Sequence, residues 1–142
     1  MTRERAAALG LAIALAAASG CGGGGGDDDG SSCVEVDLEC DPLYEPAFEQ
    51  IHQRTFLAKC ALEGTACHAS EGAQNGLVLE DIDTAYDTLL RSRVIPDDPA
   101  CSLLIRRVRA EEPGFRMPPG QRPLSDAESC VLIQWIARGA PR

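Results

Sequence analysis

Apolar residues recur at helical spacing in four stretches of the chain, and no stretch alternates apolar and polar residues long enough to predict a sheet. The first predicted helix begins at Pro46, because proline is favourable at the first helical position, and runs to about Lys59. The second predicted helix follows Asp81 or Asp83, and either aspartate can cap it.

The third predicted helix starts at Asp98, which can act as its N-cap. Its apolar face has the i, i+3, i+4, i+7 spacing and consists of Cys101, Leu104, Ile105 and Val108. The fourth helix opens with a capping box from Ser125 to Glu128 and ends at Gly139. Its broad apolar side consists of Val131, Leu132, Trp135 and Ile136. The pattern therefore predicts an all-α domain with about four short helices.

The first 20 residues have the features of an export signal, with two arginines followed by an apolar run too short to span a bilayer. Residues 18–21, Ala-Ser-Gly-Cys, resemble the lipobox of bacterial lipoproteins. That resemblance implies cleavage before Cys21 and lipidation of Cys21, which would anchor the protein in the cell envelope. An ordinary signal peptide with a chance cysteine is the alternative.

Residues 21–39 begin with a run of glycine, aspartate and serine, so we expect a disordered tether there and a folded domain at 40–142. A glycine next to Cys21 resembles the outer-membrane sorting signal, which places the protein on that membrane, facing the periplasm or the surface. The formal net charge of -9 argues against nucleic acid and anionic headgroups as partners. We therefore expect membrane contact through the lipid alone.

Seven cysteines are many for a chain of this length, and one of them is Cys21. In an oxidising compartment the other six are expected to form disulfides unless a cofactor takes some of them. We predict a disulfide between Cys101 and Cys130, near the starts of the third and fourth helices. We predict a second between Cys33 and Cys40, at the end of the tether.

Cys67 and His68 are adjacent, and Cys60 precedes them by a short loop, which is close to the C-x-x-C-H motif of covalently attached haem. In that motif two thiols one turn apart reach the porphyrin edge. Here Gly64 occupies the position of the first thiol, and six residues separate the two cysteines. The alternative is a Cys60–Cys67 disulfide, with His68 as an exposed loop residue.

The order of these features, with Met117 in the proline-rich loop at 115–123, resembles the small cytochrome c-like domains of bacterial envelope lipoproteins. The resemblance covers roughly 41–140. It implies haem c as the cofactor, axial ligation of its iron by His68 and Met117, and attachment through Cys60 and Cys67. It further implies transfer of single electrons between redox protein partners in the envelope. Arg116 or Arg122 would then be placed to pair with a haem propionate.

The remaining residues leave other hypotheses open. One is a disulfide-stapled binding or structural lipoprotein with the same helices and no haem. Zinc is disfavoured because no C-x-x-C pair is present. We expect no enzymatic activity, because no serine, cysteine or carboxylate set has catalytic spacing. His52 is predicted to be a half-exposed helix residue, with a second haem ligand as the alternative, and Arg106, Arg107 and Arg109 are expected on the solvated side of the third helix.

Overall fold

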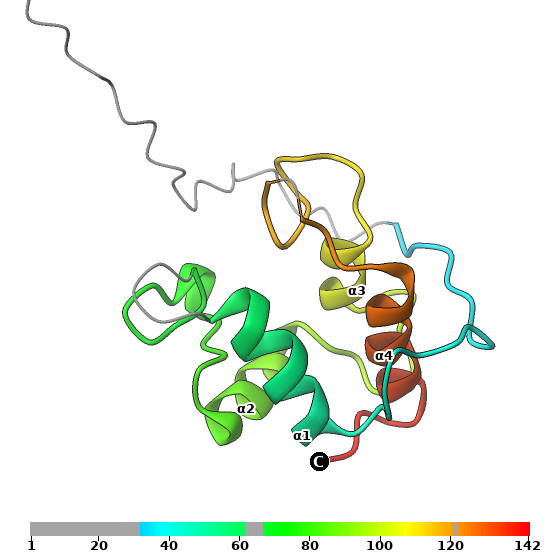
Figure 1. The fold of residues 1–142 in the computed structure, drawn as a ribbon, viewed down its shortest axis with the longest axis horizontal. Helices are drawn as coiled ribbons and strands as arrows, with labels where there is room; N and C mark the ends of the chain where they lie inside the picture. Colours follow the sequence, from blue (N-terminus) through cyan, green and yellow to red (C-terminus); the bar gives the residue numbers. More distant parts are fainter. Residues whose placement is uncertain (1–31, 62–66, 121) are drawn as a thin grey trace, which may run out of the picture.

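The computed structural model describes residues 32–61, 67–120 and 122–142 (Figure 1). The predicted signal peptide, lipidation of Cys21 and most of the tether lie outside the described residues. Within the described part, no helix has the length and apolar character needed to cross a membrane.

The described residues form helices and no strand, which confirms the all-α prediction. The elements in chain order are α1 (Phe48–Ile51), the π-helix η1 (His52–Cys60), the 3₁₀-helix η2 (Gln74–Gly76), α2 (Ile82–Ser92), α3 (Leu103–Val108) and α4 (Asp126–Ala137). Helix α1 continues directly into η1, so one helical segment leads the chain to Cys60. Figure 1 shows α1 and α2 in one half of the domain and α3 and α4 in the other.

Two of the three predicted capping residues lie at the start of a helix in the structure. The Asp81 side chain accepts a hydrogen bond from the backbone N–H of Thr84 at the start of α2. Ser125 and Glu128 form the predicted capping box of α4. The predicted start of the third helix at Asp98 is wrong, because Asp98 instead caps a turn by accepting the N–H of Cys101, 3.1 Å away. Helix α3 begins only after Ser102, whose backbone is extended.

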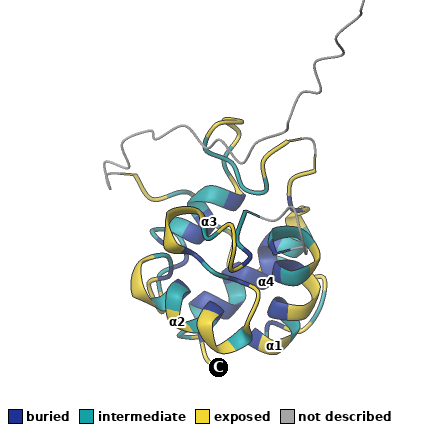
Figure 2. Ribbon diagram, turned by 90° about the vertical axis from the view of Figure 1, so that its left-hand side faces the viewer, coloured by how far each residue is buried: buried dark blue, intermediate teal, exposed yellow. Residues whose placement is uncertain are grey.

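The core lies around α4, which the other helices cover (Figure 2). The Trp135 side chain is fully buried, and the Phe48 ring lies 5.3 Å from it between ring centroids. The indole Nε1–H donates to the carbonyl of Pro141 at 2.7 Å, and the Tyr86 hydroxyl donates to the carbonyl of Ala140 at 3.0 Å. The C-terminal segment is therefore fixed against the same core.

Two disulfides hold the segment 33–43, here called the strap, along α3 and α4 (Figure 1). They join Cys33 to Cys101 and Cys40 to Cys130, so the predicted pairing of Cys101 with Cys130 and of Cys33 with Cys40 is wrong. The strap contains no helix, and its two cysteines bond to different parts of the chain, Cys33 to Cys101 just before α3 and Cys40 to Cys130 within α4. Backbone hydrogen bonds support this path, from Val34 N to Ala100 O and from Leu43 N to Ala127 O. Two disulfides also fit an oxidising compartment.

Candidate functional site

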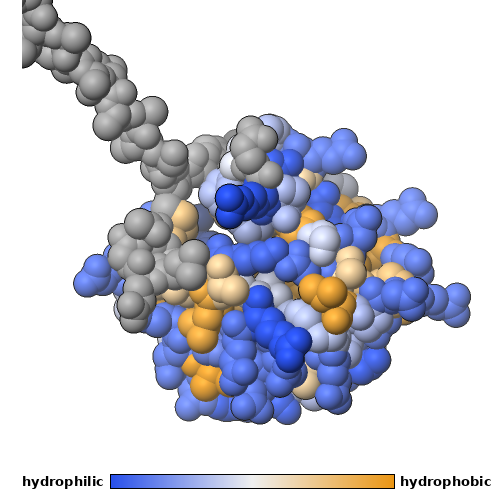
Figure 3. Space-filling view, viewed as in Figure 1, coloured by the Kyte–Doolittle hydropathy of each residue, from blue (hydrophilic) through white to orange (hydrophobic). Residues whose placement is uncertain are grey.

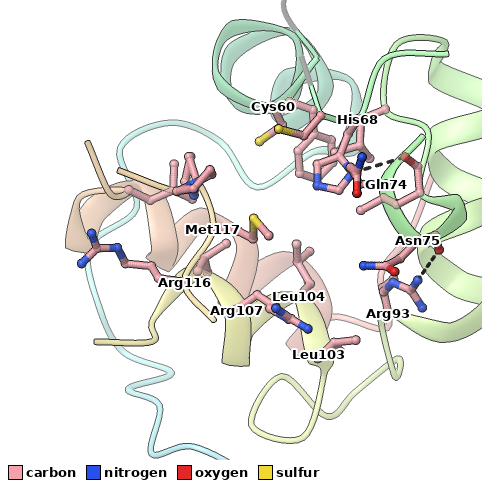
Figure 4. A pocket seen from close by; sticks show the side chains of 18 of the residues that line it. Cys60, His68, Gln74, Asn75, Arg93, Leu103, Leu104, Arg107, Arg116 and Met117 are labelled. Atoms are coloured by element: carbon pink, nitrogen blue, oxygen red, sulfur yellow. Dashed lines mark hydrogen bonds between the residues drawn. The ribbon is translucent and has the colours of Figure 1, made fainter. Parts of the chain in front are cut away.

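A cavity of about 410 Å³ opens between the two halves of the domain. Its walls come from the end of η1, the segment 67–79, the residue after α2, helix α3, the loop 113–119 and the core side of α4. Figure 4 shows the side chains that line it. The four residues predicted as haem ligands or attachment points all line this cavity. They are Cys60, Cys67, His68 and Met117.

The His68 ring is oriented by the backbone of the following segment. Its Nδ1 lies 3.3 Å from the carbonyl oxygen of Leu77, and because a carbonyl only accepts, Nδ1 carries the hydrogen. The Nε2 atom is then left with a lone pair. The His68 carbonyl also accepts the N–H of Leu79 at 2.7 Å, which holds the residue from the backbone side. His68 is half-buried, so it is not the exposed loop residue of the alternative hypothesis.

Burial lowers the pKa of His68, and the positive charge of Arg93 lowers it further. The hydrogen bond to Leu77 acts in the opposite direction but does not outweigh them, so the pKa lies below its usual value. At neutral pH the imidazole is therefore uncharged. The uncharged ring is the form that coordinates a metal.

Met117 is fixed on the other side of the cavity by the loop that follows α3. Its backbone N–H donates to the carbonyl of Arg107 at 2.9 Å, which ties the loop to α3. Its side chain is half-buried and points toward the side of the cavity formed by Cys60 and His68 (Figure 4). Met117 is therefore not a solvent-facing loop residue, and its thioether shares a cavity with the imidazole of His68.

Cys60 is the last residue of η1, and its carbonyl accepts the N–H of His68 at 3.3 Å. Its thiol is free, so the Cys60–Cys67 disulfide of the alternative hypothesis is not formed. Burial raises the pKa of the Cys60 thiol to about 12, although nearby Lys59 opposes this shift. Cys67 lines the same cavity but, unlike Cys60, is not a free thiol.

Three arginines also line the cavity, and only Arg116 among them was predicted to lie near a haem. Arg93 donates to the carbonyl of Asn75 at 2.8 Å, and Arg107 donates to the carbonyl of Phe115 at 3.2 Å while stacking on its ring. Arg107 is half-buried, so its predicted place on the solvated side of the third helix is wrong, whereas Arg109 is exposed as predicted. Arg106 is half-buried too, 5.9 Å from the centroid of the Phe115 ring.

Of the two arginines considered for propionate pairing, Arg116 lines the cavity and Arg122 does not. Arg116 donates from Nη2 to the carbonyl of Gly120 at 2.6 Å. Its Nε atom is buried and has no hydrogen-bond partner among the described residues. An unsatisfied buried donor is costly, so a ligand acceptor at this position would be stabilising.

His52 has a structural role instead of the half-exposed position predicted for it. Its side chain is only 6% exposed, and its ring Nε2 lies 3.1 Å from the carbonyl of Leu79. It does not line the cavity, so it does not share that space with Met117. The described residues contain no cluster of three or more His, Cys, Asp or Glu side chains that could hold a metal ion.

The comparisons with known proteins add one finding. Residues 65–121, which include His68 and Met117 and make up less than half of the chain, match the family described as Planctomycete cytochrome C, PSCyt1. No curated protein matches the chain, and no solved structure matches it. The family match covers most of the segment that forms the cavity walls, and it supports a cytochrome c-like domain here.

Proposed function

We propose that this protein binds haem and carries single electrons in the bacterial cell envelope, and that His68 and Met117 would hold the haem iron. The observation that carries the proposal is that these two residues, far apart in the sequence, line one cavity, His68 from the segment after η1 and Met117 from the loop after α3. The family match over residues 65–121 supports the same assignment.

The residues of the cavity fit such a group. Its volume of about 410 Å³ lies within the range of small-molecule and cofactor sites. Its walls combine buried apolar side chains, such as Phe56, Leu104 and Leu132, with a few polar groups. The unpartnered Nε–H of Arg116 is a donor that a carboxylate can satisfy.

The chain's residues would give the bound group a defined role. Bound haem would supply a reversible one-electron change at its iron. His68 offers Nε2 because Leu77 holds Nδ1, and Met117 offers a thioether, a ligand that favours a raised potential. If His68 and Met117 both held the iron, they would leave no position on it for a small molecule. This arrangement suits electron transfer and not activation of a substrate, so we propose a carrier and not an enzyme.

We further propose that Cys60 forms a thioether to the haem, because its free thiol lines the same cavity. Its raised pKa keeps it protonated at neutral pH, which means that attachment would depend on a maturation system that activates the thiol. Cys67 is disulfide-bonded in this structure, so the attachment through Cys67 that the sequence predicted would require that bond to be reduced first.

The cellular setting is part of the proposal. The two disulfides support an oxidising compartment, and the N-terminal sequence supports export and lipidation of Cys21. Figure 3 shows a face covered mostly by hydrophilic side chains, with hydrophobic ones in small patches. A carrier with this surface and an acidic chain would meet its redox protein partners by electrostatic attraction to basic surfaces. Mass spectrometry of the mature N-terminus, with C21A as control, tests the lipidation.

Expression with the periplasmic haem-maturation machinery tests the function. We expect a reduced spectrum with sharp visible bands and a haem stain that survives denaturing electrophoresis. H68A should lose the low-spin spectrum, M117A should lose the absorption of sulfur-ligated ferric haem, and C60A should lose the stain. H52Q, which changes the histidine outside the cavity, is the control and should keep all three. A colourless wild-type protein, in cells that mature another c-type cytochrome, would exclude the proposal.

A further inference from the structure

His52 is a buried histidine that has no part in the proposed function. It is the first residue of η1, and its side chain is only 6% exposed. Its Nε2 atom lies 3.1 Å from the carbonyl oxygen of Leu79, and because a carbonyl only accepts, Nε2 carries the hydrogen. The ring therefore donates a buried hydrogen bond to a backbone group 27 residues further along the chain.

Leu79 is hydrogen-bonded to both histidines of the chain. Its carbonyl accepts from His52, and its backbone N–H donates to the carbonyl of His68 at 2.7 Å. Two residues earlier, the carbonyl of Leu77 accepts from Nδ1 of the His68 ring at 3.3 Å. Residues 77–79, here called the support segment, therefore hold His68 both through its backbone and through its ring.

Two side chains from helices anchor the support segment. His52 is one, and Thr88 of α2 is the other, since its hydroxyl oxygen lies 3.1 Å from the carbonyl of Val78. The Thr88 hydroxyl has a single hydrogen, and it lies closer to the carbonyl of Thr84 in its own helix, at 2.8 Å. Its bond to Val78 is therefore shared, whereas the Nε2–H of His52 is directed to Leu79 alone among the described residues. His52 is the stronger of the two anchors.

Loss of the His52 donor would reach His68 through this segment. Leu79 is only 2% exposed, so water has little access to its carbonyl, and a buried carbonyl without a donor is costly. The support segment would then relax toward another donor, and both hydrogen bonds that hold His68 would move with it. In metal proteins, partners of this kind fix the tautomer and the orientation of a ligating imidazole.

We propose that His52 is a positioning residue for His68 and acts through the backbone of Leu79. It holds the support segment where the Leu77 carbonyl keeps the hydrogen of the imidazole on Nδ1 and leaves the lone pair on Nε2. This inference rests on the proposed function, in which Nε2 of His68 would bind the haem iron. It adds a residue outside the cavity that determines how that atom is presented.

The test follows the His68 ring by nuclear magnetic resonance in the full ¹⁵N-labelled chain, exported in a host without haem-attachment machinery so that the disulfides form. Spectra are recorded at pH 8, where the ring is uncharged. Wild type should show the hydrogen of His68 on Nδ1. H52L keeps an apolar side chain of similar size but has no donor, so its His68 ring should shift toward the Nε2–H form that a free imidazole side chain prefers. Each His52 variant has a single histidine left, which assigns the signals directly.

Amide hydrogen exchange gives a second measurement on the same samples. In H52L the N–H of Leu79 should exchange about tenfold faster relative to the amides of α4, because the loss of one hydrogen bond loosens the support segment locally. A general loss of stability would instead speed exchange in α4 to the same extent.

Matched variants separate the donor from the size of the side chain. H52Q keeps an amide N–H at the distance of Nε2, so it should behave as wild type here and in the haem-loaded protein. H52N is one methylene shorter and should behave as H52L. T88V removes the shared hydrogen bond to Val78 and should leave the His68 hydrogen on Nδ1.

The outcomes separate this inference from the function on which it rests. A folded H52L that keeps the Nδ1–H form and the protection of the Leu79 amide would overturn the inference and leave the haem protein intact. If urea unfolding shows that H52L does not fold, H52Q and H52N decide, and identical spectra for the two would overturn it. An effect of T88V as large as that of H52L would contradict the specific role of His52. A wild type that takes up no haem during maturation would overturn the proposed function, and with it the ligand role of His68, whatever the spectra of the haem-free chain show.

Discussion

Removing either disulfide should destabilise the domain by nearly the same amount, although the two bridges span sequence separations of 68 and 90 residues. The reason lies in how the two bridges overlap. When one is intact, the other closes a ring of about 36 residues, made of the strap between Cys33 and Cys40 and the chain between Cys101 and Cys130. That ring is the same for both bridges.

The chain-entropy relation gives about 4 kcal/mol at 25 °C for a ring of this size, and native-state strain lowers such values in practice. We therefore expect C33A/C101A and C40A/C130A each to lose about 2 to 4 kcal/mol in free energy of unfolding. Cys130 is buried and Cys101 is half-buried, so the second variant should lose up to about 1 kcal/mol more from the sulfur removed from the core.

Urea unfolding followed by circular dichroism measures these losses, with peptide mapping under non-reducing conditions on each variant. Mapping should recover the remaining bridge in its original pairing. The reasoning fails if one double variant is as stable as wild type while the other loses several kcal/mol, because a shared ring does not allow such a difference. It also fails if wild type yields a peptide that joins Cys33 to Cys40.

Three further predictions follow from local contacts. S125A should cost about 1 kcal/mol of stability, measured by urea unfolding, because it removes one half of the capping box of α4. Burial acts to raise the pKa of Glu128, but hydrogen bonds from Lys59 and Ser125 outweigh it, so the pKa is lowered from 4.5. The stabilisation from Glu128 should therefore be present above pH 4.5 and disappear as the pH falls through the lowered pKa, and E128Q should remove this acid-side part of the stability profile, measured by urea unfolding at a series of pH values. In the folded chain prepared without haem, the Cys60 thiol should react slowly with iodoacetamide at pH 8 and rapidly after unfolding, because its pKa is raised to about 12; rapid alkylation of the folded chain would contradict its burial.

Local signals predicted the helices best. Helix α4 begins at the predicted capping box, because a serine and a glutamate three residues apart satisfy each other's backbone N–H groups without help from the rest of the fold. Asp98 carries a similar signal but caps a turn, because Ser102 bonds back to the segment around Ile95 and delays the helix to Leu103. A capping residue thus marks a point where backbone donors need acceptors, and tertiary contacts decide whether a helix follows.

The residues of the candidate site also differ in whether a local sequence pattern could predict them. The sequence placed His68 and Met117 in suitable loops, because an imidazole next to a cysteine and a methionine before two prolines are local patterns. Arg93 and the Leu77 carbonyl have no such pattern, since both reach the cavity only through the path of the chain between η1 and α3. The predicted disulfide pairing was wrong for a related reason. Four cysteines allow three connectivities, and only the course of the strap selects one of them.

The strap has a mechanical consequence. A pull on the N-terminal end of the described chain reaches Cys33 first and passes through sulfur to Cys101 at the approach to α3, and any load that continues along the strap passes at Cys40 into α4. Covalent bonds, and not side-chain packing, would therefore carry the load into the centre of the domain. The loop that holds Met117 lies between Cys101 and Cys130 in the chain, so a disulfide joins the chain on each side of it to the strap.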